Sequence, residues 1–195
     1  MKITIGSRAM SSPIWEEQVS VAPWGVLRDY KTIPSESFDS FSCGNDDMDR
    51  WFKMQAMKDC RCGLCSCHVC VMPDNSIAGF FALSPSSVQS ESLSSGMSGG
   101  ISRLPIPVYL IGRLGVRTDL QGRGLGARLV REALVFVREL SRVGGGRLAI
   151  IDAKSEELAA WYEHLGFTRL KGNPLRLAMK MRRIEQVING ANRLR

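Results

Sequence analysis

Long apolar runs are absent from this 195-residue sequence. No stretch approaches the roughly 18 apolar residues that a membrane-spanning helix requires. The opening segment, MKITIGSRAM, also lacks the uninterrupted apolar core of a secretory signal. From these two absences we expect a cytoplasmic protein that has no membrane partner.

Internal repeats are absent as well, and the chain is too short for two full domains. We therefore expect one globular domain over residues 38–182. An N-terminal segment with a first strand (1–37) precedes it, and a basic C-terminal tail (183–195) follows. The tail could contact a nucleic acid, cover a dimer edge or be disordered, and disorder is the default for a terminus.

The sequence lacks a second cysteine pair at the spacing of a zinc site. Cys43 stands alone, and the other five of the six cysteines lie in CRCGLCSCHVC, residues 60–70, where only Cys62 and Cys65 have CxxC spacing. A disulfide framework is not expected in a cytoplasmic chain of this size. The cluster is therefore either a metal site that includes His68 or a cysteine-rich strand.

Alternation favours the strand. One face would carry Cys65, Cys67, Val69 and Val71, and the other would carry Ser66, His68, Cys70 and Met72. Cysteine then acts as a small hydrophobic residue in a buried sheet. On this interpretation we expect no bound metal.

Acidic residues are scarce in the second half of the chain. Residues 101–195 contain 18 Lys and Arg against 8 Asp and Glu, whereas residues 1–100 contain 8 against 11. Such a basic half suits a polyanionic partner, for example a nucleic acid or a phosphorylated cofactor. A merely solvated basic surface explains the composition equally well.

The hydrophobic pattern predicts a mixed α/β sheet covered by helices. A helix is expected after an Asn45 cap, and residues 85–104, rich in Ser and Gly, are expected to form a mobile loop. Further helices are expected over 125–142 and 155–166. Strands are expected over 64–72, 77–84, 106–116, 147–152, 167–170 and 175–181.

Three glycines stand at alternate positions where the strongest strand leads into the longest helix, in RTDLQGRGLGARLVREAL, residues 117–134. Glycine in a helix costs about 1 kcal/mol relative to alanine, so this placement calls for a reason. Backbone N–H groups at a helix N-terminus, unobstructed by side chains, form a site for a phosphate. The apolar positions of this helix leave four arginines outward: Arg128, Arg131, Arg138 and Arg142.

Two other phosphate-binding loops fit less well. A P-loop is excluded because no Gly-Lys-Ser/Thr follows the glycines. Gly122, Gly124 and Ala127 match the dinucleotide pattern GxGxxA, and Asp152 closes the next strand. However, residues 117–121 separate the strand from the first glycine, and too little sequence follows for a doubly wound sheet.

The glycine loop QGRGLG, together with WYEHLGF at residues 161–167, resembles the GNAT superfamily of N-acetyltransferases. The segments FSCGNDDMDRWFKMQA, IAGFFALSPSSV, IGRLGV and NPLRLAMKM extend this resemblance to the tRNA-acetylating toxins of bacterial toxin–antitoxin modules. The resemblance covers about residues 38–182. It implies a GNAT-like, mainly antiparallel central sheet flanked by helices, and acetyl-CoA as co-substrate.

The resemblance also implies roles for individual residues. The strand edge at Leu114, Gly115 and Val116 would pair with the pantetheine arm of acetyl-CoA. The pyrophosphate would lie on the backbone of Gln121, Gly122, Arg123, Gly124, Leu125 and Gly126. Tyr162 would hydrogen-bond to the thioester and protonate the departing thiolate, the alternative being a half-buried residue beside Trp161. His164 and Asp152 are assigned no catalytic role.

The sequence thus predicts an enzyme that acetylates the α-amine of aminoacyl-tRNA and so blocks translation. The arginines of the long helix are plausible tRNA contacts, and the resemblance implies a ribbon-helix-helix antitoxin as partner, with a homodimer possible. One alternative is a GNAT enzyme that acts on a protein or a small-molecule amine. Another is a non-catalytic module that binds acyl-CoA or nucleic acid.

Overall fold

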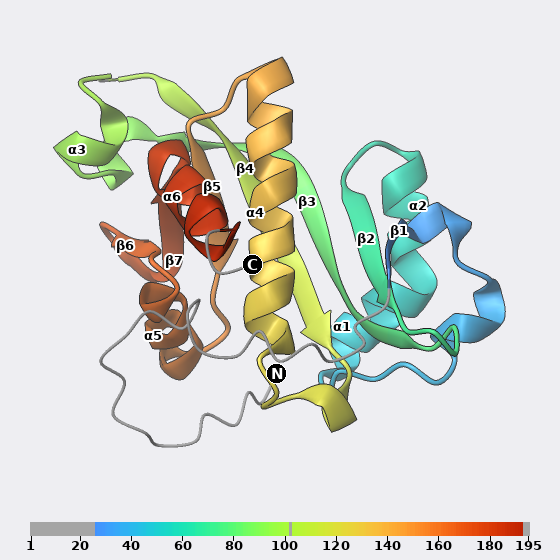
Figure 1. The fold of residues 1–195 in the computed structure, drawn as a ribbon. Coiled ribbons are helices and arrows are strands. Elements are labelled where there is room, and N and C mark those ends of the chain that lie inside the picture. The colour runs from blue at the N-terminus through green and yellow to red at the C-terminus, as the bar shows by residue number, and fades with distance from the viewer. Residues whose placement is uncertain (1–25, 102, 193–195) are drawn as a thin grey trace.

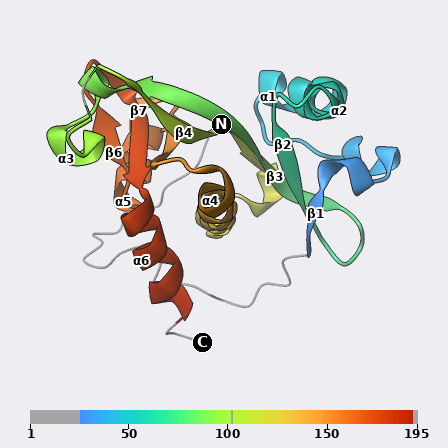
Figure 2. The ribbon, with the colours of Figure 1, turned by 90° about the horizontal axis from the view of Figure 1, so that it is seen from above.

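The computed structural model describes residues 26–101 and 103–192, which form a seven-stranded sheet with helices on both faces (Figures 1 and 2). The strand order is β1-β2-β3-β4-β5-β7-β6, and all neighbours are antiparallel except the parallel pair β4 and β5. This confirms the predicted mixed, mainly antiparallel sheet. The strands are β1 (Val26–Asp29), β2 (Ser66–Val71), β3 (Ile77–Gln89), β4 (Pro105–Val116), β5 (Leu148–Asp152), β6 (Thr168–Leu170) and β7 (Asn173–Lys180).

Helices cover each face of the sheet with a separate apolar cluster. The helices are α1 (Asp46–Arg50), α2 (Ala56–Arg61), α3 (Ser95–Ser98), α4 (Leu125–Gly144), α5 (Glu156–His164) and α6 (Met181–Asn192). The largest cluster joins the sheet to α4, α5 and α6, and a second joins the opposite face to α1 and α2 (Figure 2). In the described ranges, 26–101 and 103–192, no helix is long and apolar enough to cross a membrane.

The predicted cap of the first helix is confirmed. The Asn45 side chain accepts a hydrogen bond from the Met48 N–H at 2.9 Å, which satisfies a donor that the first helical turn leaves free. The helix continues through a π-helical segment, Trp51–Gln55, into α2. Trp51 and Phe52 are buried against the sheet by this arrangement.

The prediction of a mobile loop over residues 85–104 is wrong for most of that segment. Strand β3 extends to Gln89 and pairs with β4 up to the Gln89–Pro105 register. A 3-10 helix (Ser90–Ser92) and α3 follow. Val88, Leu93 and Met97 are buried together, so scattered apolar residues order a segment that its serine and glycine content suggested was a loop.

The expectation that the C-terminal tail is disordered is also wrong for residues 183–192. Helix α6 starts at Met181, so the predicted boundary between residues 182 and 183 falls within its first turn. Ile184, Val187 and Ile188 are buried in the same cluster as α4. Their spacing of three and four residues gives the helix one apolar face, which explains why this basic segment folds.

From Ser66 the cysteine-rich segment is a strand with the predicted alternation, whereas Cys60 lies in α2 and Cys62 directly follows that helix. Cys67, Val69 and Val71 of β2 are buried on the α1–α2 side, whereas Cys70 is buried on the α4 side. The His68 ring lies 4.1 Å from the ring of Phe136 on α4, centroid to centroid. Burial lowers the pKa of His68, which keeps the imidazole neutral in this apolar contact.

We predict that the purified protein carries no stoichiometric zinc and remains folded in the presence of a chelator. The Cys60 and Cys65 sulfurs are 3.8 Å apart, but Cys70 lies on the other face of the sheet. Burial raises the pKa of Cys65 to about 12, which disfavours the thiolate that a metal needs. Elemental analysis and thermal unfolding with EDTA test this. One tightly held zinc per chain would contradict it.

Candidate acetyl-transfer site

The sheet opens between β4 and β5. The two strands pair only from Val108–Leu148 to Ile111–Ile151, and β4 then continues to Val116. A bulge falls at Gly112, because Ala82 of β3 pairs with Arg113 while the next residue, Leu83, pairs with Ile111. The edge of β4 over residues 112–116 therefore has no strand partner on the β5 side within the described chain.

The three residues predicted to pair with pantetheine lie on this open edge. Leu114 and Val116 direct their side chains into the α4-side cluster. Gly115 faces the other way, where an added Cβ would lie 2.8 Å from the Phe80 ring and 3.3 Å from Cys43 Cβ. Both faces of this segment are therefore filled by packing, and only its backbone is available to hold a ligand.

The glycine loop connects β4 to α4, and two of its glycines have a left-handed backbone conformation. Gly122 and Gly124 have φ values of 75° and 81°, which other residues adopt only at a cost. Gly124 is the N-cap of α4, and nothing lies within 4 Å of where its Cβ would be. The loop is therefore shaped by the conformational freedom of glycine, and it leaves open space in front of the helix.

The loop presents a row of unused donors. For the backbone N–H groups of residues 122–127, no hydrogen-bond partner is found among the residues that the structure describes. The N-terminus of the 20-residue helix α4 adds the positive end of its dipole at the same point. This is the arrangement that binds a phosphate group, and the residues fit a pyrophosphate.

Gln121 differs from the expected role. Its backbone N–H already donates to the Thr118 carbonyl at 3.3 Å. Its side-chain amide donates to the carbonyl oxygens of Cys43 and Val116, both at 2.9 Å. Gln121 therefore ties the loop to the end of β4 and to a segment 78 positions earlier in the chain. The first donor available to a phosphate is the N–H of Gly122.

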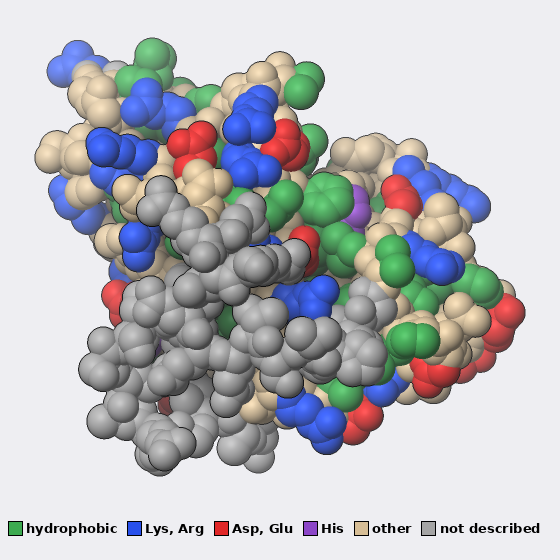
Figure 3. Space-filling model, viewed as in Figure 1, with side chains coloured by type: hydrophobic (Ala, Val, Ile, Leu, Met, Phe, Trp, Pro, Cys, Tyr) green, Lys and Arg blue, Asp and Glu red, His purple; other side chains and the backbone are tan. Residues whose placement is uncertain are grey.

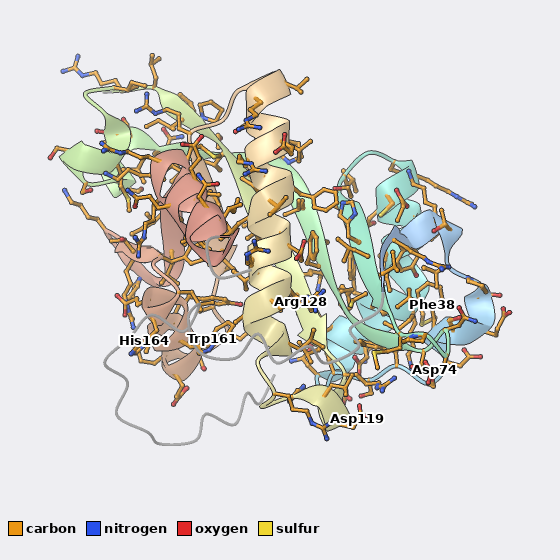
Figure 4. The ribbon with its side chains drawn as sticks, viewed as in Figure 1. Phe38, Asp74, Asp119, Arg128, Trp161 and His164 are labelled. Atoms are coloured by element: carbon orange, nitrogen blue, oxygen red, sulfur yellow. The ribbon has the colours of Figure 1, made fainter. Side chains whose placement is uncertain are left out.

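Gly126 lies where three elements of the fold come together. A Cβ at this position would lie 3.5 Å from the Trp161 ring and 4.0 Å from a Val116 methyl group. The end of β4, the first turn of α4 and α5 therefore meet here, and Figure 4 shows Trp161 between α5 and α4. This convergence places the open strand edge, the glycine loop and α5 around one region.

Tyr162 lies on α5, which Ser155 caps by accepting a hydrogen bond from the Leu158 N–H at 3.2 Å. The tyrosine is 3% exposed, and its ring contacts those of Trp161 and Phe167. Within the described residues its hydroxyl has no hydrogen-bond partner. Burial raises the pKa of Tyr162 well above its ordinary value, so the phenol keeps its proton at neutral pH.

The two side chains that were assigned no catalytic role are held in other interactions. His164 is exposed, and its Nδ1 lies 2.7 Å from the Ala160 carbonyl oxygen. The Asp152 carboxylate is 3.0 Å from the Arg176 guanidinium. Among the described residues, no contact of either side chain with Tyr162 or with the glycine loop is found.

The four arginines of α4 are less outward than predicted. The side chains of Arg131 and Arg138 are only 17% and 20% exposed and lie beside Glu132 and Glu139. Long arginine side chains can lie along the helix flank in this way. Arg128 is exposed, and Arg142 is 60% exposed and 3.4 Å from Glu139. Figure 3 shows this mixture of basic and acidic side chains along the upper part of α4.

Comparison with known proteins identifies the family. Residues 65–169 match the acetyltransferase (GNAT) domain family. A tRNA-acetylating toxin of Mycobacterium tuberculosis is 31% identical over 143 residues, which are 73% of this chain and 85% of that protein. The chain belongs to the GNAT acetyltransferase family. The predicted family, its fold and its class of enzyme are thereby confirmed.

Solved structures of toxins share the fold of this GNAT acetyltransferase. AtaT complexed with acetyl-methionyl-tRNAfMet has a TM-score of 0.75 and 23% identity, covering 83% of this chain and 98% of that one. A mutant of the AtaT toxin bound to the C-terminus of the antitoxin AtaR and acetyl-CoA has a TM-score of 0.69 and 21% identity, covering 83% and 96% of the two chains. At these identities the likeness concerns the fold.

One residue near the open edge was missed by the sequence reasoning. Arg113 on β4 has its guanidinium carbon 4.6 Å above the centroid of the Trp51 ring. The available signal was a single charged residue within the apolar run IPVYLIGRLGV. Its partner is 62 positions away in the sequence, so the contact could not be predicted from local pattern.

Proposed function

We propose that this GNAT acetyltransferase transfers the acetyl group of acetyl-CoA to the α-amine of an aminoacyl-tRNA and so blocks translation. The observation that carries this proposal is the 31% identity to a tRNA-acetylating toxin over most of both chains. The described site fits an acetyl-CoA donor, because free N–H groups at a helix mouth adjoin an open strand edge. The excess of basic residues in the second half of the chain suits a polyanionic acceptor.

Acetyl-CoA supplies the acetyl group as a thioester. Gly122 to Ala127 hold the pyrophosphate through their N–H groups, and the backbone of Leu114 to Val116 aligns the pantetheine arm. A backbone N–H of the open β4 edge, toward Gly112 where the acetyl group would lie, stabilises the oxyanion that forms when the amine attacks. The Tyr162 hydroxyl protonates the departing thiolate, a role for which its raised pKa keeps the proton in place. The proton that the attacking amine loses as the amide forms passes to solvent, and solvent returns a proton to Tyr162.

The acceptor amine explains why the site needs no strong base. An α-amine has a pKa of about 8 or below, so a useful fraction is neutral at physiological pH. A lysine side chain, with a pKa of about 10.4, would need a base to lose its proton. His164 and Asp152 are assigned no such task here.

A partner protein is part of the proposal. A ribbon-helix-helix antitoxin would neutralise the enzyme, in keeping with the antitoxin-bound structure of AtaT, and a homodimer would extend the surface that meets tRNA. Both proteins would act in the cytoplasm, where aminoacyl-tRNA is found. Co-expression with the neighbouring reading frame, followed by size-exclusion chromatography, tests both associations.

One competition assay tests the proposed function. The enzyme is incubated with labelled acetyl-CoA and a mixture of aminoacyl-tRNA, lysine peptides and polyamines. Label is expected on tRNA, and it should be released by mild base that cleaves the aminoacyl ester. Label on peptide or polyamine but not on tRNA would defeat the proposal and favour a protein or small-molecule acceptor.

The exposed arginines of α4 lead to a prediction about salt. Arg128→Glu combined with Arg142→Glu is expected to weaken tRNA binding and to reduce the slope of log K against log salt by about 1.8, at about 0.9 for each lost duplex-phosphate contact. Arg50→Glu, an exposed change on α1, serves as control. Filter binding between about 50 and 200 mM salt measures both. An unchanged slope in the double variant would show that this face does not contact tRNA.

A further inference from the structure

Arg113 occupies an unusual place on β4. It follows the bulge at Gly112 and pairs with Ala82, a buried residue of the α1–α2 cluster. It therefore lies on the face opposite α4, at the point where β4 loses its β5 partner. Its side chain is partly exposed in an otherwise apolar strand.

The Arg113 guanidinium lies over an indole ring that is itself fixed by hydrogen bonding. It lies 4.6 Å from the centroid of the buried Trp51 ring. The Trp51 indole N–H donates to Asp59 Oδ2 at 2.7 Å, and the Gln55 amide donates to Asp59 Oδ1 at 2.9 Å. These residues come from the π-helical segment Trp51–Gln55 and from α2. Segments of this kind are frequent at functional sites.

Among the residues that the structure describes, the Arg113 guanidinium interacts with the Trp51 ring and, through charge alone, with the Asp59 carboxylate. Across residues 26–101 and 103–192, no carboxylate lies within 4 Å of its guanidinium and no acceptor bonds to it. The nearby Asp59 carboxylate is already bonded to Trp51 and Gln55. The N–H groups of a guanidinium form a planar fork, which can bind a phosphate in a bidentate manner.

A phosphate bound by Arg113 could belong either to acetyl-CoA or to the acceptor substrate. The position of Arg113 along β4 decides between them. The pyrophosphate site is at the glycine loop, beyond Val116. The pantetheine arm then runs back along β4 toward Gly112. Arg113 precedes Val116 by three residue steps of strand, which is about 10 Å. Arg113 is thus at the acetyl end of the edge, away from the phosphates of acetyl-CoA and near the incoming acceptor.

We infer that Arg113 is a specificity-determining residue that binds a phosphodiester of the single-stranded 3′ end of the aminoacyl-tRNA. This inference rests on the proposed function. The contact would anchor the terminal nucleotides so that the α-amine reaches the thioester. A small amine, which has no such phosphate, gains nothing from it.

The test compares two acceptors that carry the same amine. One is the aminoacyl-tRNA found in the competition assay, and the other is the methyl ester of the same amino acid. Arg113→Gln is expected to lower the ratio of kcat/KM for tRNA to kcat/KM for the ester by about 10-fold or more, the size of one charge-assisted contact. The loss should appear mainly as a raised KM for tRNA, and the salt slope should fall by about 0.7.

Two further variants keep the result decisive. Arg50→Gln is the matched control, because it removes the same charge from an exposed arginine next to Trp51 in the sequence. It should leave the ratio unchanged. Arg113→Lys keeps the charge without the planar fork and should give an intermediate ratio, which also decides the matter if Arg113→Gln fails to fold.

The outcomes separate the two proposals. An unchanged ratio in Arg113→Gln, or a weaker affinity for acetyl-CoA measured by calorimetry, would overturn the role of Arg113 alone. A wild-type enzyme that acetylates the ester or peptides but no aminoacyl-tRNA would overturn the proposed function, and the role of Arg113 with it.

Discussion

Tyr162→Phe is expected to lower kcat by about 10²-fold or more while leaving the affinity for acetyl-CoA unchanged. The substitution removes one hydroxyl and keeps the buried ring that contacts Trp161 and Phe167. A general acid acts in the transition state, so its loss lowers turnover without weakening ground-state binding. Steady-state kinetics and calorimetry on the same preparation measure the two quantities.

Tyr109→Phe is the matched control. Tyr109 lies on β4, and its hydroxyl donates to the Leu140 carbonyl at 3.2 Å, toward the far end of α4. Removal of this hydroxyl should leave turnover near the wild-type value. Near-normal turnover in Tyr162→Phe would show that another group or water protonates the thiolate.

The pH profile provides a second test of Tyr162. Activity should rise as the acceptor amine loses its proton near about pH 8. Burial raises the pKa of Tyr162, and the proton that it donates is therefore retained through this range. No fall in kcat from loss of that proton is expected up to about pH 9. A descending limb below that pH that disappears in Tyr162→Phe would contradict the raised pKa.

The fold was largely predictable because its main signals are local. The Asn45 cap, the alternation in β2 and the apolar spacing in α4 each depend on residues a few positions apart. Segments 85–104 and 183–192 were misjudged for the opposite reason. Their order comes from apolar residues that become buried only against distant strands and helices, such as Met97 and Ile188.

The site was predictable in outline and not in detail. The glycine pattern located the phosphate cradle, but it could not show that the Gln121 side chain bonds to Cys43 or that Arg113 stacks on Trp51. It also could not show that Arg131 lies partly buried beside Glu132. These contacts depend on how distant segments pack together or on how a side chain lies along its helix. Composition and spacing alone do not reveal either.

Gly124→Glu is expected to abolish measurable binding of acetyl-CoA, whereas Gly124→Gln should weaken it much less. Both side chains enter the open space in front of α4, and both strain a backbone with φ of 81° equally, at a cost of about 1–2 kcal/mol. The two variants therefore differ only in charge. A carboxylate near the pyrophosphate would repel it by several kcal/mol, equivalent to about 100-fold or more in affinity.

Calorimetry with acetyl-CoA at low and high salt measures this difference, and thermal unfolding checks that both variants fold alike. The gap between Glu and Gln should narrow as salt screens the repulsion. Equal affinities for the two variants would mean that no anion lies at the mouth of α4. The N–H groups of residues 122–127 would then lose their assigned ligand, and the direction in which acetyl-CoA runs along β4 would have to be reversed or abandoned.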